Sequence, residues 1–208
     1  MLVGRTGHEL PWGSLTGIRP TKIALSRLED GWKEEDIRKF MKETYMTSDE
    51  KINLSIEIAA REKRLLEPLD YDRGYSLYVG IPFCPSICLY CSFSSYPLKV
   101  WEKRTDEYVE ALCREVRETA LMMKGRKLDT IYIGGGTPTT LLPHQIRKLL
   151  DTVGEAFGYE GLAEFTVEAG RPDSITREKL MAIREYPVTR ISVNPQTMNQ
   201  ETLDIIGR

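Results

Sequence analysis

Three of the four cysteines lie within eight residues, as Cys84, Cys88 and Cys91, directly after an apolar run that ends at Ile81. Cysteines this close together hold a metal or close a tight disulfide. Three thiolates are one too few for a closed tetrahedral zinc site, and no histidine lies near them. They can hold three corners of a 4Fe–4S cube and leave one iron open to a non-protein ligand. We interpret this open iron as the centre of the function; a zinc knuckle or a group of buried thiols is the alternative.

A run of three glycines, Gly134 to Gly136, is the second feature with chemical meaning, and Thr137 follows it. Without a Cβ, this backbone can approach a ligand closely and expose its N–H groups. The run resembles a phosphate-binding loop, although it matches neither the dinucleotide pattern G-x-G-x-x-G nor the P-loop pattern. We interpret it as a ligand loop, with a plain turn as the alternative.

Three polar residues further along the chain also follow, or come close after, apolar runs. Glu168 could accept hydrogen bonds from ribose hydroxyls, as acidic residues do for other nucleotides. Gln196 offers an amide that both donates and accepts, and Arg208 could pair with a carboxylate. Considered alone, Glu168 and Arg208 are as well explained as solvated surface residues.

Four short apolar runs must position these features, and we expect them to be strands over residues 76–81, 130–133, 163–168 and 189–193. Helical patterns separate them over residues 105–124, 143–157 and 174–185, and Thr197 or Asn199 could cap a last helix. Each link is long enough for a right-handed crossover, which predicts a parallel sheet. Strands this apolar are typical of sheets covered on both faces. Because chemistry collects at the carboxyl ends of parallel strands, the predicted site lies at one edge of the sheet.

A helical region precedes these strands. We expect one helix capped by Thr21, a second over residues 33–46, and a third that begins with the capping pattern Thr47-x-x-Glu50 and stops at Pro68. The predicted organisation is therefore a helical region over residues 1–70 and an α/β unit over residues 71–208. Two residues outside the motifs are expected to be structural: His8 as an exposed loop residue, and Cys113 as a small buried side chain on a helix.

Composition limits the class of protein. The 208 residues are 41% hydrophobic and 29% charged, which is typical of a soluble globular protein. A net charge of −2 indicates no broad nucleic-acid or membrane footprint, and we expect no membrane span and no secretion signal. Clustered cysteines in such a chain fit a reducing cytoplasm, where thiols act as ligands.

In combination, the motifs resemble the radical S-adenosylmethionine (SAM) superfamily, whose cysteine signature has an aromatic residue before its third cysteine, here Tyr90. The run from Tyr78 to Cys91, the sequence 134–139, Glu168, and the pair Gln196 and Arg208 together resemble the oxygen-independent coproporphyrinogen III oxidase family. Residues 10–22 look most like its HemZ-type members. One departure is Gly80, where the family often has histidine.

The resemblance implies a 4Fe–4S cluster on Cys84, Cys88 and Cys91, with SAM bound to the open iron. It places Tyr78 beside SAM as the catalytic residue and implies that SAM is contacted by Tyr78, Tyr90, Gly135, Gly136, Thr137, Glu168, Gln196 and Arg208. The family fold is an incomplete (β/α) barrel of six units. About four βα units are present here, so we expect a truncated chain whose last strand, 189–193, is an unpaired parallel edge.

The implied activity is the oxidative decarboxylation of coproporphyrinogen III to protoporphyrinogen IX in heme biosynthesis, by a radical that SAM cleavage generates. The implied partners are the porphyrinogen and an electron donor such as flavodoxin or ferredoxin. The alternative within the family is a heme-binding, heme-trafficking protein without oxidase activity. A purely structural metal domain, which would bind zinc, is the third hypothesis.

Overall fold

The computed structural model describes residues 7, 10–17, 19–70 and 73–208, so His8 lies outside the described residues. The chain divides into two compact units, Met1–Leu69 and Asp70–Arg208. Within the residues described, no helix is long and apolar enough to cross a bilayer.

The described part of the first unit contains the helices α2 (Thr21–Glu29), α3 (Glu34–Tyr45) and α4 (Asp49–Leu66). Apolar side chains recur along each helix at the spacing that forms one face, and these faces meet in a small core. Its fully buried members are Ala24, Ile37, Met41, Ile52 and Ala59.

Two predicted caps in this unit are wrong. The cap of α4 is Ser48, whose hydroxyl accepts a hydrogen bond from the Lys51 amide at 3.4 Å. Thr47, the predicted cap, is fully buried, and its hydroxyl instead donates to the Trp12 carbonyl. Thr21 is the first residue of α2, which has no side-chain cap. At α4 the neighbouring Thr47 and Ser48 offer equivalent hydroxyls, and packing decides between them. At α2 the residue before the helix is Pro20, whose side chain cannot cap.

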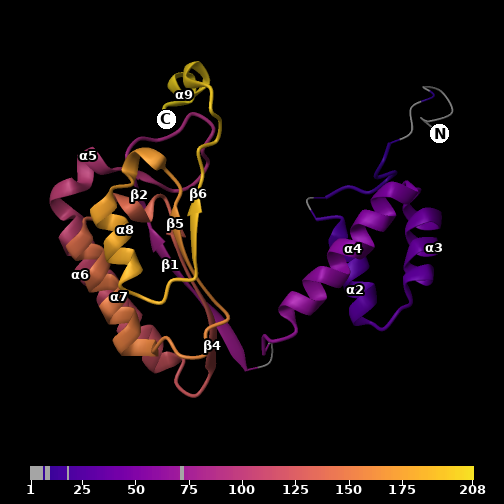
Figure 1. The fold of residues 1–208 in the computed structure, drawn as a ribbon, viewed down its shortest axis with the longest axis horizontal. Coiled ribbons are helices and arrows are strands. Elements are labelled where there is room, and N and C mark those ends of the chain that lie inside the picture. The colour runs from indigo at the N-terminus through magenta and orange to yellow at the C-terminus, as the bar shows by residue number, and fades with distance from the viewer. Residues whose placement is uncertain (1–6, 8–9, 18, 71–72) are drawn as a thin grey trace. The chain divides into compact units, whose positions relative to one another are not determined.

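The second unit is built on a parallel sheet with the strand order β1-β4-β5-β6 (Figure 1). These strands are β1 (Gly74–Ile81), β4 (Lys127–Gly135), β5 (Glu164–Ala169) and β6 (Arg190–Val193). Their order follows the sequence without reversal. A doubly wound sheet reverses its order at a switch point, whereas a (β/α) barrel does not. The predicted fold class, a partial (β/α) barrel preceded by a helical region, is therefore confirmed.

Helices connect the strands, and a small extra sheet lies after β1. Two-residue strands β2 (Phe83–Cys84) and β3 (Tyr96–Pro97) pair with each other around the cysteine loop, residues 84–91. The helices are α5 (Leu98–Trp101), α6 (Thr105–Met122), α7 (Pro143–Phe157), α8 (Arg177–Arg184) and α9 (Gln200–Ile206), with 3-10 turns at Glu102–Arg104, Pro138–Thr140 and Pro172–Ser174.

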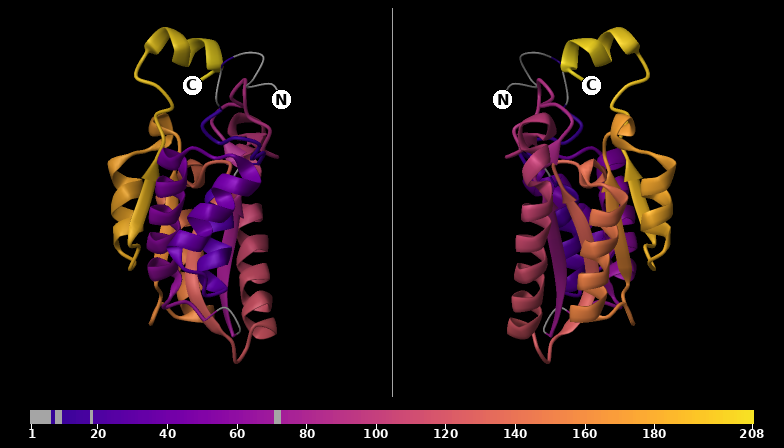
Figure 2. Two further views of the ribbon diagram at one scale, coloured as in Figure 1. Left: turned by 90° about the vertical axis from the view of Figure 1, so that its right-hand side faces the viewer. Right: turned by 90° about the vertical axis from the view of Figure 1, so that its left-hand side faces the viewer.

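Helices α6, α7 and α8 all cover the same face of the sheet, as the views in Figures 1 and 2 show. Alternate strand residues pack against them, including Val79, Ile133 and Phe165, and Cys113 is fully buried in this core, as predicted. The other face is open: Tyr78 is 62% exposed there. The expectation that both faces are covered is not met within the described chain, because a (β/α) barrel places its helices on the outside and fills its inside with side chains from the whole ring of strands.

β6 forms one edge of the sheet, and all its residues are exposed. Ile191 and Val193 are 40% and 53% exposed, although their register partners Val167 and Ala169 are buried. Among the described residues β6 pairs only with β5, so the predicted parallel edge is present.

The last two helices of this unit begin with side-chain caps. Thr176 caps α8 by accepting from the Lys179 amide, so the predicted start at Ser174 is wrong. Ser174 instead lies in a 3-10 turn, where its hydroxyl is 2.6 Å from that of Thr139. Asn199, one of the two residues expected to cap the last helix, caps α9.

Candidate cofactor site

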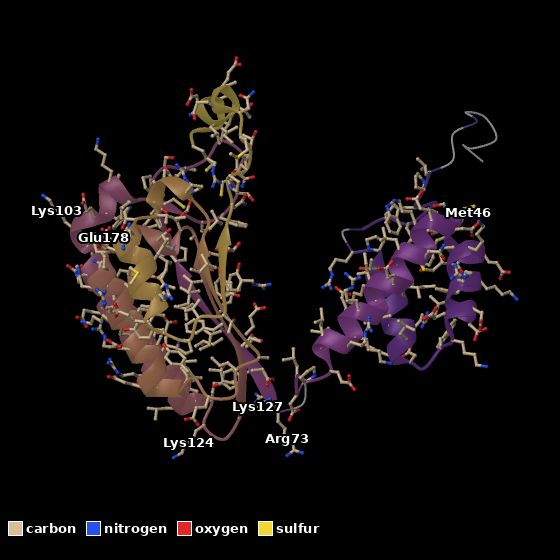
Figure 3. All side chains as sticks on the ribbon, in the orientation of Figure 1. Met46, Arg73, Lys103, Lys124, Lys127 and Glu178 are labelled. Carbon is tan, nitrogen blue, oxygen red and sulfur yellow. The ribbon has the colours of Figure 1, made fainter. Side chains whose placement is uncertain are left out.

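The motifs follow the carboxyl ends of the strands, and parallel pairing brings these ends to one edge of the sheet. Ile81 pairs with Gly135, and Glu168 with Ser192. In Figure 1 the loop after β1 and helix α9 lie at this end. Arg73 and Lys127 mark the opposite end of the sheet in Figure 3. The site therefore lies where (β/α) barrels carry their chemistry.

Gly135 and Gly136 have no room for a side chain, because the segment that leads into the cysteine loop lies against them. Gly135 has a φ of +109°, and a Cβ there would be 2.9 Å from the backbone N and O of Ile81. A Cβ on Gly136 would be 2.8 Å from the Phe83 carbonyl oxygen and 3.0 Å from the Sγ of Cys84. The Gly136 amide also donates to the Ile81 carbonyl at 2.7 Å. These glycines thus permit close approach of two backbone segments.

The three clustered cysteines are free thiols on one loop. Cys88 is 9% exposed, and its carbonyl accepts from the Cys91 amide at 3.0 Å. The Sγ of Cys84 lies 3.4 Å from the hydroxyl of the buried Thr137, which joins the cysteine loop to the residue after the glycines.

The three thiols suit an iron–sulfur cube better than a single metal ion. Among the described residues, no three side chains of histidine, cysteine, aspartate or glutamate converge on a position for a single metal ion. A 4Fe–4S cube takes each thiolate on a different iron, so it needs no such convergence. Three free thiols within eight residues, on a loop that lies against a glycine run, fit the cube.

Sequence reasoning missed Arg171, which follows β5 and contacts the cysteine loop. Its Nη1 lies 3.3 Å from the Sγ of Cys88, and its side chain is 6% exposed. The Asp173 carboxylate, which accepts from the other two guanidinium nitrogens, raises the pKa of Arg171 above its usual value. The sequence signal that could have identified Arg171 is an aspartate two residues after it, directly beyond a predicted strand. Such a pair can be buried at a place where either charge alone could not.

Tyr78, Tyr132 and Glu168 form a second group, on the open face of the sheet. Tyr78 and Tyr132 are register partners, and their rings stack at 5.8 Å between centroids. The Tyr132 hydroxyl donates to Oε1 of Glu168. A Cβ on Gly134 would collide with the Tyr132 ring and lie 2.9 Å from Oε2 of Glu168. Tyr132, also missed from the sequence, therefore fixes the orientation of the predicted ribose-binding carboxylate.

Replacing Tyr132 with phenylalanine is expected to reduce stability in a pH-dependent way. Burial and the hydrogen bond to Glu168 raise the pKa of Tyr132 from 10 to about 12, so the fold favours the neutral phenol. Its contribution is complete below pH 10 and is lost as pH rises through about 12. Urea unfolding of both proteins should show a difference in free energy that is constant below pH 10 and shrinks above it; a constant difference at every pH would contradict the assignment.

Arg208 joins three segments at the same end of the sheet. Its Nη1 donates to the Tyr90 hydroxyl at 2.8 Å, and its Nη2 donates to the carbonyls of Gly170 and Asn194 at 2.5 and 2.6 Å. Gln196 has a φ of +66°, a conformation that is uncommon for residues other than glycine. Its backbone amide donates to the Asn194 side chain, while its exposed amide group forms no hydrogen bond with the other predicted residues within the described chain.

The structure thus brings the predicted residues together in separate small groups. Cys84 lies with Gly136 and Thr137, Tyr90 with Arg208, and Tyr78 with Glu168 through Tyr132.

Comparison with known proteins places this arrangement in a family. The model of the radical SAM superfamily matches residues 78–208. The "oxygen-independent coproporphyrinogen-III oxidase-like protein HemZ" of Bacillus subtilis is 39% identical over 212 residues, which cover 100% of this chain and 42% of that protein. The "heme chaperone HemW" of Bacillus subtilis is 41% identical over 134 residues, 64% of this chain and 35% of that protein.

A solved structure supports the same relationship. It is described as coproporphyrinogen III oxidase (HemN) from Escherichia coli, a radical SAM enzyme, and it matches with a TM-score of 0.60 and 32% identity. The match covers 71% of this chain and 34% of that one, and the chain spans less than half the length of these relatives. The chain belongs to the radical SAM superfamily, in the branch that contains the HemZ and HemN proteins.

Proposed function

We propose that this chain holds a 4Fe–4S cluster and SAM and takes part in the oxygen-independent oxidation of coproporphyrinogen III to protoporphyrinogen IX. The observation that carries the proposal is the contact of the cysteine loop with the glycine run. A Cβ on Gly136 would lie 3.0 Å from the Sγ of Cys84, and Thr137 touches the same sulfur. The superfamily as a whole implies both cofactors.

When bound, the cluster and SAM supply the 5′-deoxyadenosyl radical that removes a hydrogen atom from a substrate propionate. The chain's own residues bind and orient. Cys84, Cys88 and Cys91 would hold three irons as thiolates, and the glycine run beside them, having no side chains, would let the methionine end of SAM approach the backbone. Both groups lie at the same end of the sheet, so the cofactors would be held side by side.

The nucleoside end of SAM is assigned to the open face and its rim. Glu168, held by Tyr132, accepts hydrogen bonds from the ribose hydroxyls. Arg208, held by backbone carbonyls and by Tyr90, supplies positive charge for the SAM carboxylate, and Gln196 supplies an amide at the edge. Tyr78, exposed beside Glu168, is the proposed catalytic residue.

The proposed substrate and partners follow from the named relatives. HemN is named as a coproporphyrinogen III oxidase and HemZ as a protein like that oxidase, so a porphyrinogen is the proposed substrate. A flavodoxin or ferredoxin is the proposed electron donor, and the cytoplasm the proposed compartment.

A heme-trafficking role is the second candidate, and the 41% identity to the heme chaperone HemW favours it. In that role the same cluster motif would be retained, but heme would be the bound porphyrin and no vinyl product would form.

The first experiment is anaerobic reconstitution with iron and sulfide, followed by EPR of the reduced protein with and without SAM. A 4Fe–4S signal that shifts when SAM is added is the expected result. Bound zinc without SAM cleavage would instead indicate a structural metal domain, and no cluster at all would overturn the proposal.

The second experiment separates the two candidate functions with one preparation. Coproporphyrinogen III is incubated anaerobically with the reconstituted protein, SAM and a reductant, and heme binding is titrated in parallel. Vinyl products support the oxidase. Stoichiometric heme binding without vinyl products overturns the oxidase and supports trafficking.

A further inference from the structure

The guanidinium of Arg171 contacts the cysteine loop, and the proposed function leaves this contact unexplained. Its Nη1 lies 3.0 Å from the Oγ of Ser86 and 3.3 Å from the Sγ of Cys88. The carbonyls of Ser86 and Gly207 lie at 3.5 and 3.4 Å from the same nitrogen. One nitrogen thus faces the middle cysteine of the motif and the carboxyl end of α9.

The aim of this nitrogen is fixed by Asp173. The Nε and Nη2 of Arg171 donate to the two carboxylate oxygens of Asp173 at 2.9 and 2.6 Å. This two-bond fork holds the guanidinium plane, so Nη1 at the free corner is directed at the loop. The arginine side chain is 6% exposed, whereas the carboxylate is 48% exposed. The charge nearest to Cys88 is therefore the buried cation.

We propose that Arg171 is a positioning residue for the cluster, which holds the cysteine loop and makes the cluster easier to reduce by donating an N–H···S hydrogen bond to Cys88. This rests on the proposed function, because it needs a cluster on Cys88. A hydrogen bond withdraws charge from a ligand thiolate, and such bonds are among the factors that set the reduction potential of iron–sulfur clusters. The affected step is the transfer of one electron from the flavodoxin- or ferredoxin-type donor to the cluster; no bond to Arg171 forms or breaks.

The test replaces Arg171 with methionine, which keeps an unbranched, uncharged equivalent of the arginine stem and removes the guanidinium with its donors. Arg147→Met is the matched control, because Arg147 forms the same two-bond fork with Glu185, at 2.7 Å for each bond, on the outer helices α7 and α8. Iron and sulfide content and the cluster's midpoint potential, from an EPR-monitored redox titration without SAM, are measured for each protein. Arg171→Met should have a more negative midpoint potential than the wild type, and Arg147→Met should keep the wild-type value.

Two further variants keep the test decisive if Arg171→Met does not fold. Arg171→Lys retains a cation and should recover part of the potential shift. Asp173→Asn keeps the guanidinium but weakens the fork that aims it, and should shift the potential in the same direction as Arg171→Met. If Arg171→Met takes up no cluster although its circular dichroism is unchanged, the loss supports the positioning role. The effect on the midpoint potential is then measured by comparing Asp173→Asn with the wild type.

The outcomes distinguish this inference from the proposed function. Wild-type potential and iron content in both Arg171→Met and Asp173→Asn would overturn the role of Arg171 and leave the cluster assignment standing. A wild-type chain that takes up no cluster would overturn the proposed function and this inference with it.

Discussion

Replacing Cys88 with alanine is expected to abolish assembly of the 4Fe–4S cluster. The proposed cube already has one iron without a protein ligand, and this substitution would leave a second iron without one. Cys88 is the middle cysteine of the three, and its sulfur lies beside Arg171. Iron and sulfide should fall to background, and the EPR signal of the reduced cluster should disappear. Cys84→Ala and Cys91→Ala should behave in the same way.

Cys113→Ala is the matched control, since it removes the remaining cysteine of the chain. Its side chain is fully buried in α6, with Sγ 4.0 Å from the Lys148 carbonyl, and it belongs to the helix-side core. Cys113→Ala should keep wild-type iron content. An intact cluster in Cys88→Ala, or a loss of iron in Cys113→Ala, would contradict the ligand assignment.

Replacing Gly135 with alanine is expected to destabilise the second unit by roughly 2–4 kcal/mol and to prevent SAM from shifting the EPR signal. Positive φ costs a residue with a Cβ about 1–3 kcal/mol. The new Cβ would also lie 2.9 Å from backbone atoms of Ile81, which cannot move without separating β1 from β4. Urea unfolding measures the first effect, and EPR with SAM the second.

Two other glycines separate these contributions. Gly158 has a φ of +71° with open space around its Cβ position, so Gly158→Ala should show the conformational cost alone. Gly170 is close to the site and has neither positive φ nor a neighbour within 4 Å, so Gly170→Ala should be nearly neutral. If Gly135→Ala costs no more than Gly158→Ala, the close contact with Ile81 is not present in solution.

The fold was predictable because its signals are local. Each strand is a short apolar run bounded by helix patterns, and the order of these runs along the chain is also their order in the sheet. The convergence of the cysteine loop, the glycine run and Glu168 then follows from parallel pairing alone. Helix caps were less predictable, since Thr47 and Ser48 have the same chemistry and only burial separates them.

The residues that sequence reasoning missed act through contacts between distant segments. Tyr132 matters because register places it beside Tyr78 and within reach of Glu168, and Arg171 matters because the loop after β5 meets the cysteine loop. Tyr132 has no signature in its own segment, and the spacing of Arg171 and Asp173 indicates a buried ion pair without indicating which loop it meets. The open face of the sheet was also missed, because the apolar composition of a strand does not tell whether one face or both are covered.

The hydrogen bonds between the cysteine loop and the end of α9 have a consequence for how the protein is made. The Leu89 amide donates to the Ile206 carbonyl at 3.0 Å, and the Ser86 hydroxyl donates to the Gly207 carbonyl at 2.7 Å, across more than a hundred residues. Closing so long a stretch of chain comes late and is entropically costly. On the ribosome, the loop therefore emerges long before α9, and this part of its restraint is absent until Gly207 has been synthesised. Cysteine labelling of stalled nascent chains of increasing length would reveal the point at which the loop is captured by α9.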